Sequence, residues 1–207
     1  MICEGFPVCA QKLKREESII EQKRKQSKKR GKAKRKEKAI TYNGNPCQDE
    51  QRTTKCVNFL DCRSKPSCTE KGKTYTLDQS ESNNEVLSMH IDGGVIDEPD
   101  SCRCDYAFFV RDRVDNGYGR AIFVELKGGA TRKALKQLIE TLNWSEVHEL
   151  AKVYKKIYCR IVNTSSVPRI QSTNEYMELK EILSKFGGNL KTGEWNFVER
   201  YEEIDNR

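Results

Sequence analysis

The sequence predicts an α/β domain that follows a strongly basic arm. Three short runs of strand-forming residues precede an amphipathic helix over residues 132–143, and a fourth run, at 156–162, precedes a second amphipathic helix over residues 174–186. Strands that alternate with helical segments in this order are typical of an α/β fold. The arm, residues 11–40, holds 14 Lys and Arg against 4 Asp and Glu.

Turn residues separate the first three predicted strands. Residues 85–91 (EVLSMHI) alternate apolar and polar side chains and end at the turn sequence DGG, residues 92–94. Residues 105–110 (DYAFFV) and 120–127 (RAIFVELK) are joined through DNG, residues 115–117, which favours a hairpin turn. The second and third strands are therefore expected to pair antiparallel.

The first helix shows an apolar stripe at helical spacing. Thr131 can cap it, after which Ala134, Leu135, Leu138 and Leu142 recur on one face. The strand at 156–162 returns after this crossover. It must run parallel to a neighbour if it lies in the same sheet.

The predicted domain closes at its C-terminal end. Gly187-Gly188 ends the second helix. A short hairpin around Thr192-Gly193 follows, with Trp195, Phe197 and Tyr201 at alternating positions. We expect Trp195 and Tyr201, with Trp144, to be core residues rather than surfaces for stacking bases.

Charge divides the chain. The arm has a net charge of +10 within a total of +7, whereas residues 41–207 hold 24 Lys and Arg against 26 Asp and Glu. We therefore divide the chain into three parts: residues 1–40, a basic helical or disordered segment that contains the arm at 11–40; residues 41–74, a Cys-rich linker or small module; and residues 75–207, an α/β domain. The arm contains no aromatic residue, which argues against base stacking there.

The arm is interpreted either as a solubilising tail or as an electrostatic grip on phosphates. In the second interpretation, deleting the arm flattens the salt dependence of nucleic-acid binding. The candidate nucleic-acid-binding residues are its central cations: Lys23, Arg24, Lys25, Lys28, Lys29, Arg30, Lys34, Arg35 and Lys36.

The nine cysteines favour a reducing compartment over a disulfide framework, because no secretory signal precedes them. Zn²⁺ at Cys47, Cys56, Cys62 and Cys68 is one interpretation. Their spacing, C-x8-C-x5-C-x5-C, lacks the close pairs typical of structural zinc sites, so free thiols in an irregular linker are the favoured one. No apolar run is long enough to span a membrane, and we expect a soluble cytoplasmic protein.

Other classes of site are disfavoured. The only histidines are His90 and His148, too few for a histidine-rich metal site. The paired glycines at 93–94 and 128–129 show neither nucleotide-binding loop pattern.

The informative group is Asp105, with Glu125 and Lys127 twenty residues later. An antiparallel hairpin brings Asp105 opposite roughly residue 127 or 128, and the period of a strand puts Glu125 and Lys127 on one face. Charged side chains among apolar ones are costly unless they pair or bind a cation. Two carboxylates, and the backbone carbonyl of Leu126, suit Mg²⁺ or Mn²⁺, which activates water and screens charge on a phosphate. Lys127 can stabilise the transition state.

These residues carry a resemblance to a known family. The run from Cys104 to Phe109, the run FVELKG at 123–128, and the helix with Gln137 resemble small bacterial proteins of the PD-(D/E)XK nuclease superfamily over residues 75–205. The resemblance implies a restriction-endonuclease-like mixed sheet flanked by helices. It also implies divalent metal at Asp105 and Glu125, Lys127 as the catalytic lysine, and Gln137 as a supporting catalytic residue.

An upstream acidic residue is also found in many relatives of this kind. Glu81 and Glu85 are the nearest candidates here, and His90 or Asp92 can substitute.

The expected function is divalent-metal-dependent hydrolysis of phosphodiester bonds in nucleic acid, with DNA as the favoured substrate and bacterial defence as the context. The first alternative is a non-catalytic nucleic-acid-binding or complex-assembly module on the same fold. The second is a zinc-stabilised adaptor built on residues 41–75. A protein partner and a homodimer both remain open.

Overall fold

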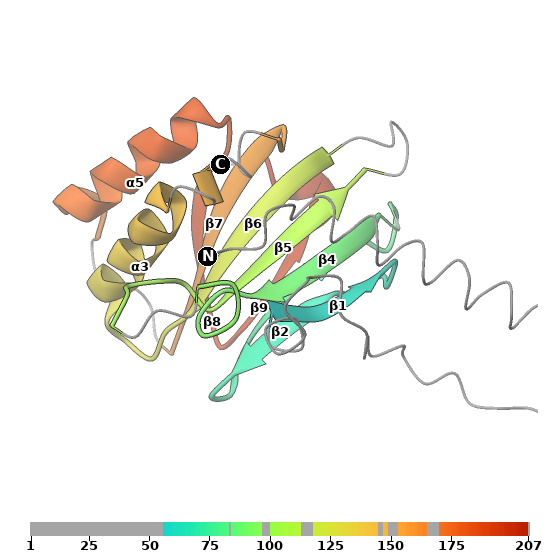
Figure 1. Ribbon diagram of the computed structural model, residues 1–207, viewed down its shortest axis with the longest axis horizontal. Coiled ribbons are helices and arrows are strands. Elements are labelled where there is room, and N and C mark those ends of the chain that lie inside the picture. The colour runs from blue at the N-terminus through green and yellow to red at the C-terminus, as the bar shows by residue number, and fades with distance from the viewer. Residues whose placement is uncertain are drawn as a thin grey trace, which may run out of the picture.

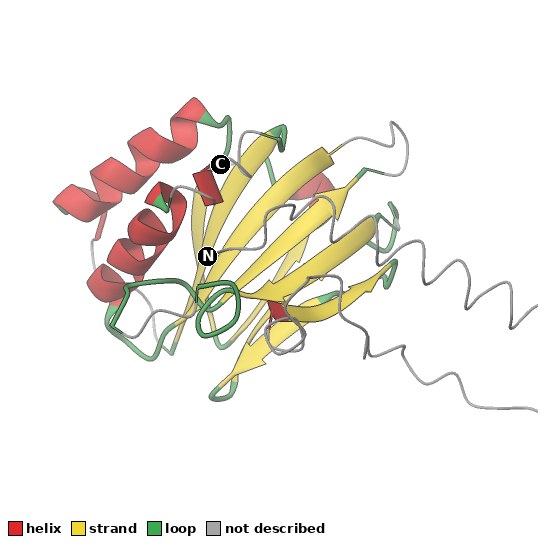
Figure 2. Cartoon of the chain, in the orientation of Figure 1, coloured by secondary structure: helices red, strands yellow, loops and turns green. Residues whose placement is uncertain are grey.

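The computed structural model describes residues 56–82, 84–96, 100–112, 118–144, 147–148, 153–164 and 170–206. These form an α/β domain with two sheets and two α-helices, shown in Figures 1 and 2. In chain order the elements are β1 (Val57–Asp61), β2 (Ser67–Glu70), β3 (Lys73–Asp78), β4 (Glu85–His90), β5 (Tyr106–Arg111), β6 (Tyr118–Leu126), α3 (Thr131–Asn143), β7 (Lys156–Asn163), α5 (Asn174–Lys185), β8 (Leu190–Glu194) and β9 (Asn196–Arg200). Short 3-10 turns cover Ile170–Ser172 and Tyr201–Glu203.

The larger sheet is mixed, with six strands in the order β1-β4-β5-β6-β7-β8. Its first four strands pair antiparallel, and β7 and β8 then run parallel to β6. The predicted β5–β6 hairpin and the parallel return after α3 are therefore confirmed. The carboxyl ends of β6, β7 and β8 consequently lie at the same end of the sheet.

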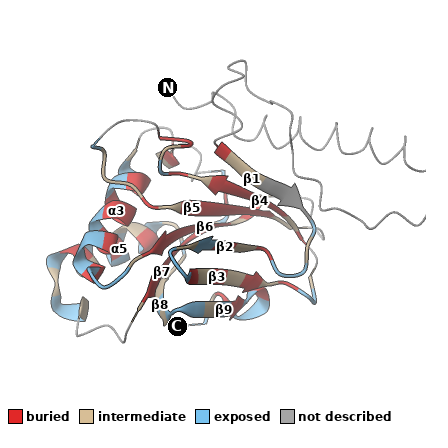
Figure 3. Cartoon of the chain, turned by 90° about the horizontal axis from the view of Figure 1, so that it is seen from below, coloured by how far each residue is buried: buried red, intermediate tan, exposed pale blue. Residues whose placement is uncertain are grey.

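Alternate residues of this sheet face two different layers. Ala121, Phe123 and their neighbours pack under α3 and α5, whereas Ile122 and Val124 pack against the smaller sheet. This period of two is what a strand buried on both faces requires. Figures 1 and 3 show α3 and α5 together on one side of the larger sheet and β2, β3 and β9 on the other.

The smaller sheet differs from the sequence prediction. Its order is β2-β3-β9, and β9 runs parallel to β3. The expected hairpin around Thr192-Gly193 is wrong, because β8 belongs to the larger sheet and β9 to the smaller one. Part of the segment expected to be an irregular Cys-rich linker also forms the strands β1 and β2.

Buried charges join the two sheets. Arg160 of β7, which is 0% exposed, donates to both carboxylate oxygens of Glu199 on β9 at 2.5 and 2.9 Å. Tyr75 donates to the same carboxylate at 3.0 Å, and Lys191 Nζ lies 2.9 Å from it. Every oxygen of Glu199 is thus satisfied, as burial of a charge requires.

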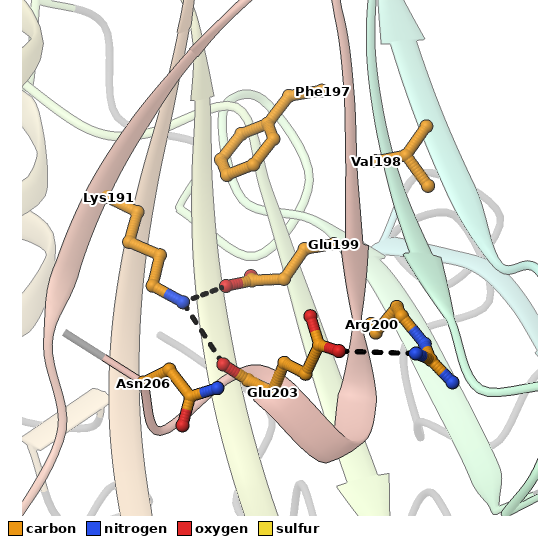
Figure 4. A pocket seen from close by; sticks show the side chains of 7 residues that line it. All are labelled: Lys191, Phe197, Val198, Glu199, Arg200, Glu203 and Asn206. Carbon is orange, nitrogen blue, oxygen red and sulfur yellow. Dashed lines mark hydrogen bonds and ion pairs between the residues drawn. The ribbon is translucent and has the colours of Figure 1, made fainter.

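A shallow pocket of about 410 Å³ opens beside this network, lined by Lys191, Phe197, Val198, Glu199, Arg200, Glu203 and Asn206. In Figure 4 the Lys191 ammonium reaches between Glu199 and the backbone carbonyl of Glu203. The charged side chains that line the pocket pair with one another, Lys191 with Glu199 and Arg200 with Glu203. We therefore assign these side chains to the contact between the two sheets and not to a ligand site.

The ends of the helices also follow from local interactions. Helix α3 begins at Thr131 itself, with Ala130 at the capping position and no side-chain cap, so the predicted Thr131 cap is wrong. Thr173 caps α5 by accepting a hydrogen bond from the backbone of Tyr176. No helix among the described residues is long and apolar enough to cross a membrane.

Candidate active site

Asp105 and Glu125 lie side by side at one end of the larger sheet. Tyr106 pairs with Val124, which places Asp105 level with Glu125 rather than with residue 127 or 128 as expected. The observed partner is two to three residues earlier in the chain than expected, and the β-bulge beyond Val110 shifts the pairing by only one residue, in the opposite direction. Asp105 Oδ2 accepts a hydrogen bond of 2.6 Å from the backbone N–H of Leu126, which fixes its carboxylate against β6.

Glu125 is almost completely buried, with 1% of its surface exposed. Its Oε1 lies 3.2 Å from Lys127 Nζ. Its other oxygen, Oε2, has no hydrogen-bond partner among the described residues. A buried carboxylate oxygen in this condition is costly unless a proton or a cation binds to it.

The ammonium group of Lys127 is held by the helix that follows. Lys127 Nζ donates to Gln137 Oε1 at 2.6 Å, and Gln137 Nε2 donates to the carbonyl of Arg103 at 2.7 Å. Thr141 donates to the Gln137 carbonyl and accepts from the backbone N–H of Cys104. Helix α3 thereby ties Lys127 to the segment that carries Asp105.

A third carboxylate reaches the site from the smaller sheet. Glu70, at the end of β2, lies near enough to Asp105 for its charge to raise the pKa of the Asp105 carboxyl. Glu70 was not predicted from the sequence, and the four residues that were predicted for this position lie elsewhere or have other partners. The missed signal was the Lys71-Gly72 pair between two strand-like runs, which forms the β2–β3 turn with φ angles of 47° and 77°.

The four candidates proposed for the upstream acidic position have other roles. Glu81 pairs with Arg200, and Glu85 lies level with Arg111 at the other end of β4. Asp92 accepts from Arg103 at 2.6 Å. His90 packs against the ring of Tyr106, with centroids 4.5 Å apart. Burial lowers the pKa of His90, and the nearby Glu70 opposes that shift.

The carboxyl groups hold their protons more tightly than usual. Burial raises the pKa of Asp105, and repulsion from Glu70 adds to this, while the Leu126 N–H and Lys127 oppose it. Burial also raises the pKa of Glu125, reinforced by Asp105 and opposed by Lys127. Ionisation of Asp105 and Glu125 together is therefore costly in this poorly solvated place unless a cation compensates their charge.

The donor set suits a hard divalent cation. Mg²⁺ and Mn²⁺ prefer carboxylate and carbonyl oxygens, and Asp105, Glu125 and Glu70 supply the first kind. Within the described part of the chain, however, no three His, Cys, Asp or Glu side chains are gathered closely enough to hold a metal ion. The fit therefore rests on the unpartnered Glu125 Oε2 and on the carboxylates around it.

The other predicted sites are distributed over the molecule. Cys56 and Cys68 are buried, whereas Cys62 is exposed. Cys47 and the nine basic residues of the arm lie outside the described residues. Cys104 is fully buried, whereas Cys102 is partly exposed near the carboxylates.

Trp195 is not the core residue that the sequence analysis expected. Half of its surface is exposed, and its φ is 42°. Tyr201 is buried, as expected, and Trp144 packs at the margin of the helix-side core. His148 stacks edge-on against Phe186.

No protein-family model, curated protein or solved structure matches the chain.

Proposed function

We propose that the protein is a divalent-metal-dependent nuclease that hydrolyses phosphodiester bonds of nucleic acid, with DNA as the favoured substrate. The observation that carries this proposal is Glu125, a buried carboxylate with one oxygen on Lys127 and the other without a partner among the residues that the structure describes. A cation that binds Asp105 and Glu125 relieves both the desolvation and the mutual repulsion of these carboxylates.

The arrangement of strands supports the same proposal. Strands β4, β5 and β6 pair antiparallel, α3 crosses over, and β7 returns parallel to β6. The mixed order of strands is compatible with the PD-(D/E)XK resemblance, although helices cover only one face of this sheet and the strands β2, β3 and β9 cover the other. In this arrangement Asp105 precedes the central strand β5, and Glu125 and Lys127 end the next strand.

Asp105, Glu125 and the Leu126 carbonyl are the proposed metal ligands, with Glu70 as a further acidic partner. A divalent cation bound there supplies Lewis acidity and lowers the pKa of water. Lys127 directs its ammonium towards Glu125, where it can neutralise charge that develops on a phosphate. Gln137 holds that ammonium in place.

The remaining proposals concern affinity and context. The basic arm supplies non-specific affinity for phosphates, because the rest of the chain is slightly acidic. A cytoplasmic location is proposed from the nine cysteines and the absence of a secretory signal in the sequence, whereas a role in bacterial defence rests on the resemblance alone.

Hydrolysis assays with Mg²⁺ and with Mn²⁺ test the proposal. Lys127→Ala and Glu125→Ala are each expected to lower the rate at least a hundredfold on a substrate that the wild-type protein cuts. Lys185→Ala and Glu181→Ala, which break an exposed pair on α5, are the matched controls and should leave the rate unchanged. Equal rates for Lys127→Ala and wild type across DNA and RNA would exclude Lys127 as a catalytic residue.

The alternative is a non-catalytic nucleic-acid-binding module. The direct pairing of Lys127 with Glu125, and the lack of a gathered three-ligand site in the described residues, favour this alternative. It predicts nucleic-acid binding without hydrolysis by the wild-type protein under either metal.

A further inference from the structure

Trp195 occupies an unusual position between β8 and β9. It is 50% exposed and adopts a φ of 42°. The left-handed region is strained for a bulky L-residue, and exposure of an indole loses much of the free energy that its burial would contribute. A glycine or asparagine at this turn would avoid both costs.

Two hydrogen bonds fix the backbone of Trp195 between the sheets. Its N–H donates to the carbonyl of Asn163 at 2.8 Å, which anchors it to the end of β7. Its carbonyl accepts from the N–H of Thr74 at 2.7 Å, which anchors it to β3. The ring is therefore presented from a rigid backbone rather than from a free loop.

This anchoring places Trp195 at the same end of the molecule as the carboxylates. In the larger sheet, Leu126 pairs with Val162, so Lys127 lies level with Asn163, the residue that holds Trp195. Neighbouring strands are about 4.8 Å apart, so the Trp195 backbone is roughly 10 Å from that of Lys127.

The smaller sheet leads to the same place. Glu70 pairs with Lys73, and Lys73 lies level with Trp195 because Thr74 pairs with Asn196. The Trp195 backbone is thus also two strand spacings, roughly 10 Å, from that of Glu70. The exposed Trp195 therefore lies about one to two nucleotide lengths from Lys127 and from Glu70, which stand on the two sides of the candidate active site.

Further polar groups accompany this aromatic residue. Lys71, at the tip of the β2–β3 turn, has 80% of its side chain exposed and pairs with Glu70 at 2.9 Å. Asn163, which is 1% exposed, has no hydrogen-bond partner for either atom of its carboxamide among the described residues. Proteins that bind single-stranded nucleic acid combine cations, which contact the phosphates, with exposed aromatic rings, on which the bases stack.

We propose that Trp195 is a stacking platform for an unpaired base, so that the substrate is single-stranded nucleic acid or a frayed end. The inference rests on the proposed nuclease function and narrows its substrate class. Within a duplex both faces of a base are already covered by its neighbours, so an indole gains a partner only where the strand is unpaired. Lys71 contacts the phosphate backbone on the same side.

Binding without catalysis tests the proposal most directly. The full-length protein is titrated, in EDTA, into a fluorescently labelled single strand and into the same sequence as a duplex. The salt concentration is kept high enough to suppress phosphate contacts by the arm. Trp195→Asn, which tolerates the left-handed backbone, is expected to weaken single-strand binding about tenfold or more and to leave duplex binding unchanged. Parallel DNA and RNA strands show which sugar is preferred.

Matched variants separate stacking from stability. Trp195→Phe keeps a ring and should retain most of the single-strand affinity, whereas Val198→Ala, at an exposed apolar residue of β9, should have no effect. A melting temperature for Trp195→Asn close to that of the wild type shows that the loss is not caused by unfolding.

The outcomes distinguish this inference from the nuclease proposal. Equal single-strand affinity for Trp195→Asn and wild type overturns the inference, even if hydrolysis depends on Lys127. Trp195-dependent binding of single strands by a protein that cuts no substrate supports the platform and overturns only the hydrolytic role.

Discussion

Lys127 is oriented by a residue of the following helix: Gln137 Oε1 accepts from Lys127 Nζ at 2.6 Å. The same amide donates to the carbonyl of Arg103, two residues before Asp105. The Gln137 side chain therefore links the residue that follows β6 to the segment that precedes β5. Displacement of α3 would move Lys127 relative to the carboxylates.

Gln137→Leu removes both of these hydrogen bonds at similar volume. Hydrogen bonds to charged groups contribute roughly 1.5–3 kcal/mol, so we expect hydrolysis to slow by about 10- to 100-fold, mainly in kcat. Gln137→Glu keeps an acceptor for Lys127 and should lose less. If Gln137→Leu instead raises KM alone, Gln137 contributes to substrate binding and not to the orientation of Lys127.

Stability in the absence of metal should fall as the pH rises through neutrality. The pKa of Asp105 is raised to about 7 and that of Glu125 to about 8, chiefly by burial. Between about pH 4 and pH 8 the unfolded chain therefore releases protons that the folded protein retains, which favours unfolding as the pH increases. The measurement is the melting temperature in EDTA from about pH 5 to pH 8.5.

The variant Glu125→Gln isolates this contribution, because it cannot ionise. Its melting temperature should decline less over the same range, and Mg²⁺ should raise the wild-type value more at high pH than at low pH. His90, whose lowered pKa acts in the opposite direction, is present in both proteins and cancels in the comparison. Asp78 and Asp205, with pKa values lowered to about 2, titrate below this window. Parallel curves for the two proteins would show that Glu125 is ionised in the folded state.

The Arg160–Glu199 pair should be costly to break from one side. Glu199→Gln leaves the fully buried guanidinium without its counter-charge, and loss of one partner of a buried pair costs about 3–5 kcal/mol. Chemical denaturation measures this change, with Glu203→Gln on the exposed turn as a control. The double variant Arg160→Met, Glu199→Leu should recover much of the loss. A double variant less stable than Glu199→Gln would mean that the charges themselves are required.

Removal of residues 1–40 tests the electrostatic role of the arm. Residues 1–40 hold 14 Lys and Arg against 5 Asp and Glu, a net +9, so their deletion should reduce the slope of log affinity against log salt concentration for duplex DNA by several units. A matched substitution of its nine central cations by Gln should have a similar effect. An unchanged slope would assign the arm to solubility instead.

The elements of the fold that could be predicted from the sequence are those that a short range of neighbouring residues determines. The strand-forming run at 105–110 and the turn chemistry at 115–117 predicted the β5–β6 hairpin, and the apolar stripe from Ala134 to Leu142 predicted α3. The convergence of Asp105, Glu125 and Lys127 followed from that hairpin. Here local pattern and tertiary contact agree.

Contacts between distant segments were not predictable in this way. Glu70 meets Asp105 only because β2 and β3 fold as a separate sheet across the face of β6, and no local pattern specifies that docking. Trp195 reads as a core residue by composition, yet the switch of the chain from one sheet to the other at this point leaves it exposed. The bulge between β5 and β6 likewise shifts by one residue the position on β6 that faces Asp105.

Parallel pairing of β3 with β9 joins the beginning of the described domain to its end, as in the contact between Tyr75 and Glu199. During synthesis, a chain released only as far as β8 already possesses Asp105, Glu125 and Lys127. It lacks β9, the strand that completes the smaller sheet, and with it Glu199, the counter-ion of Arg160. A product of the gene truncated after β8 would therefore carry the three charged residues on a domain whose two sheets are no longer joined through Glu199.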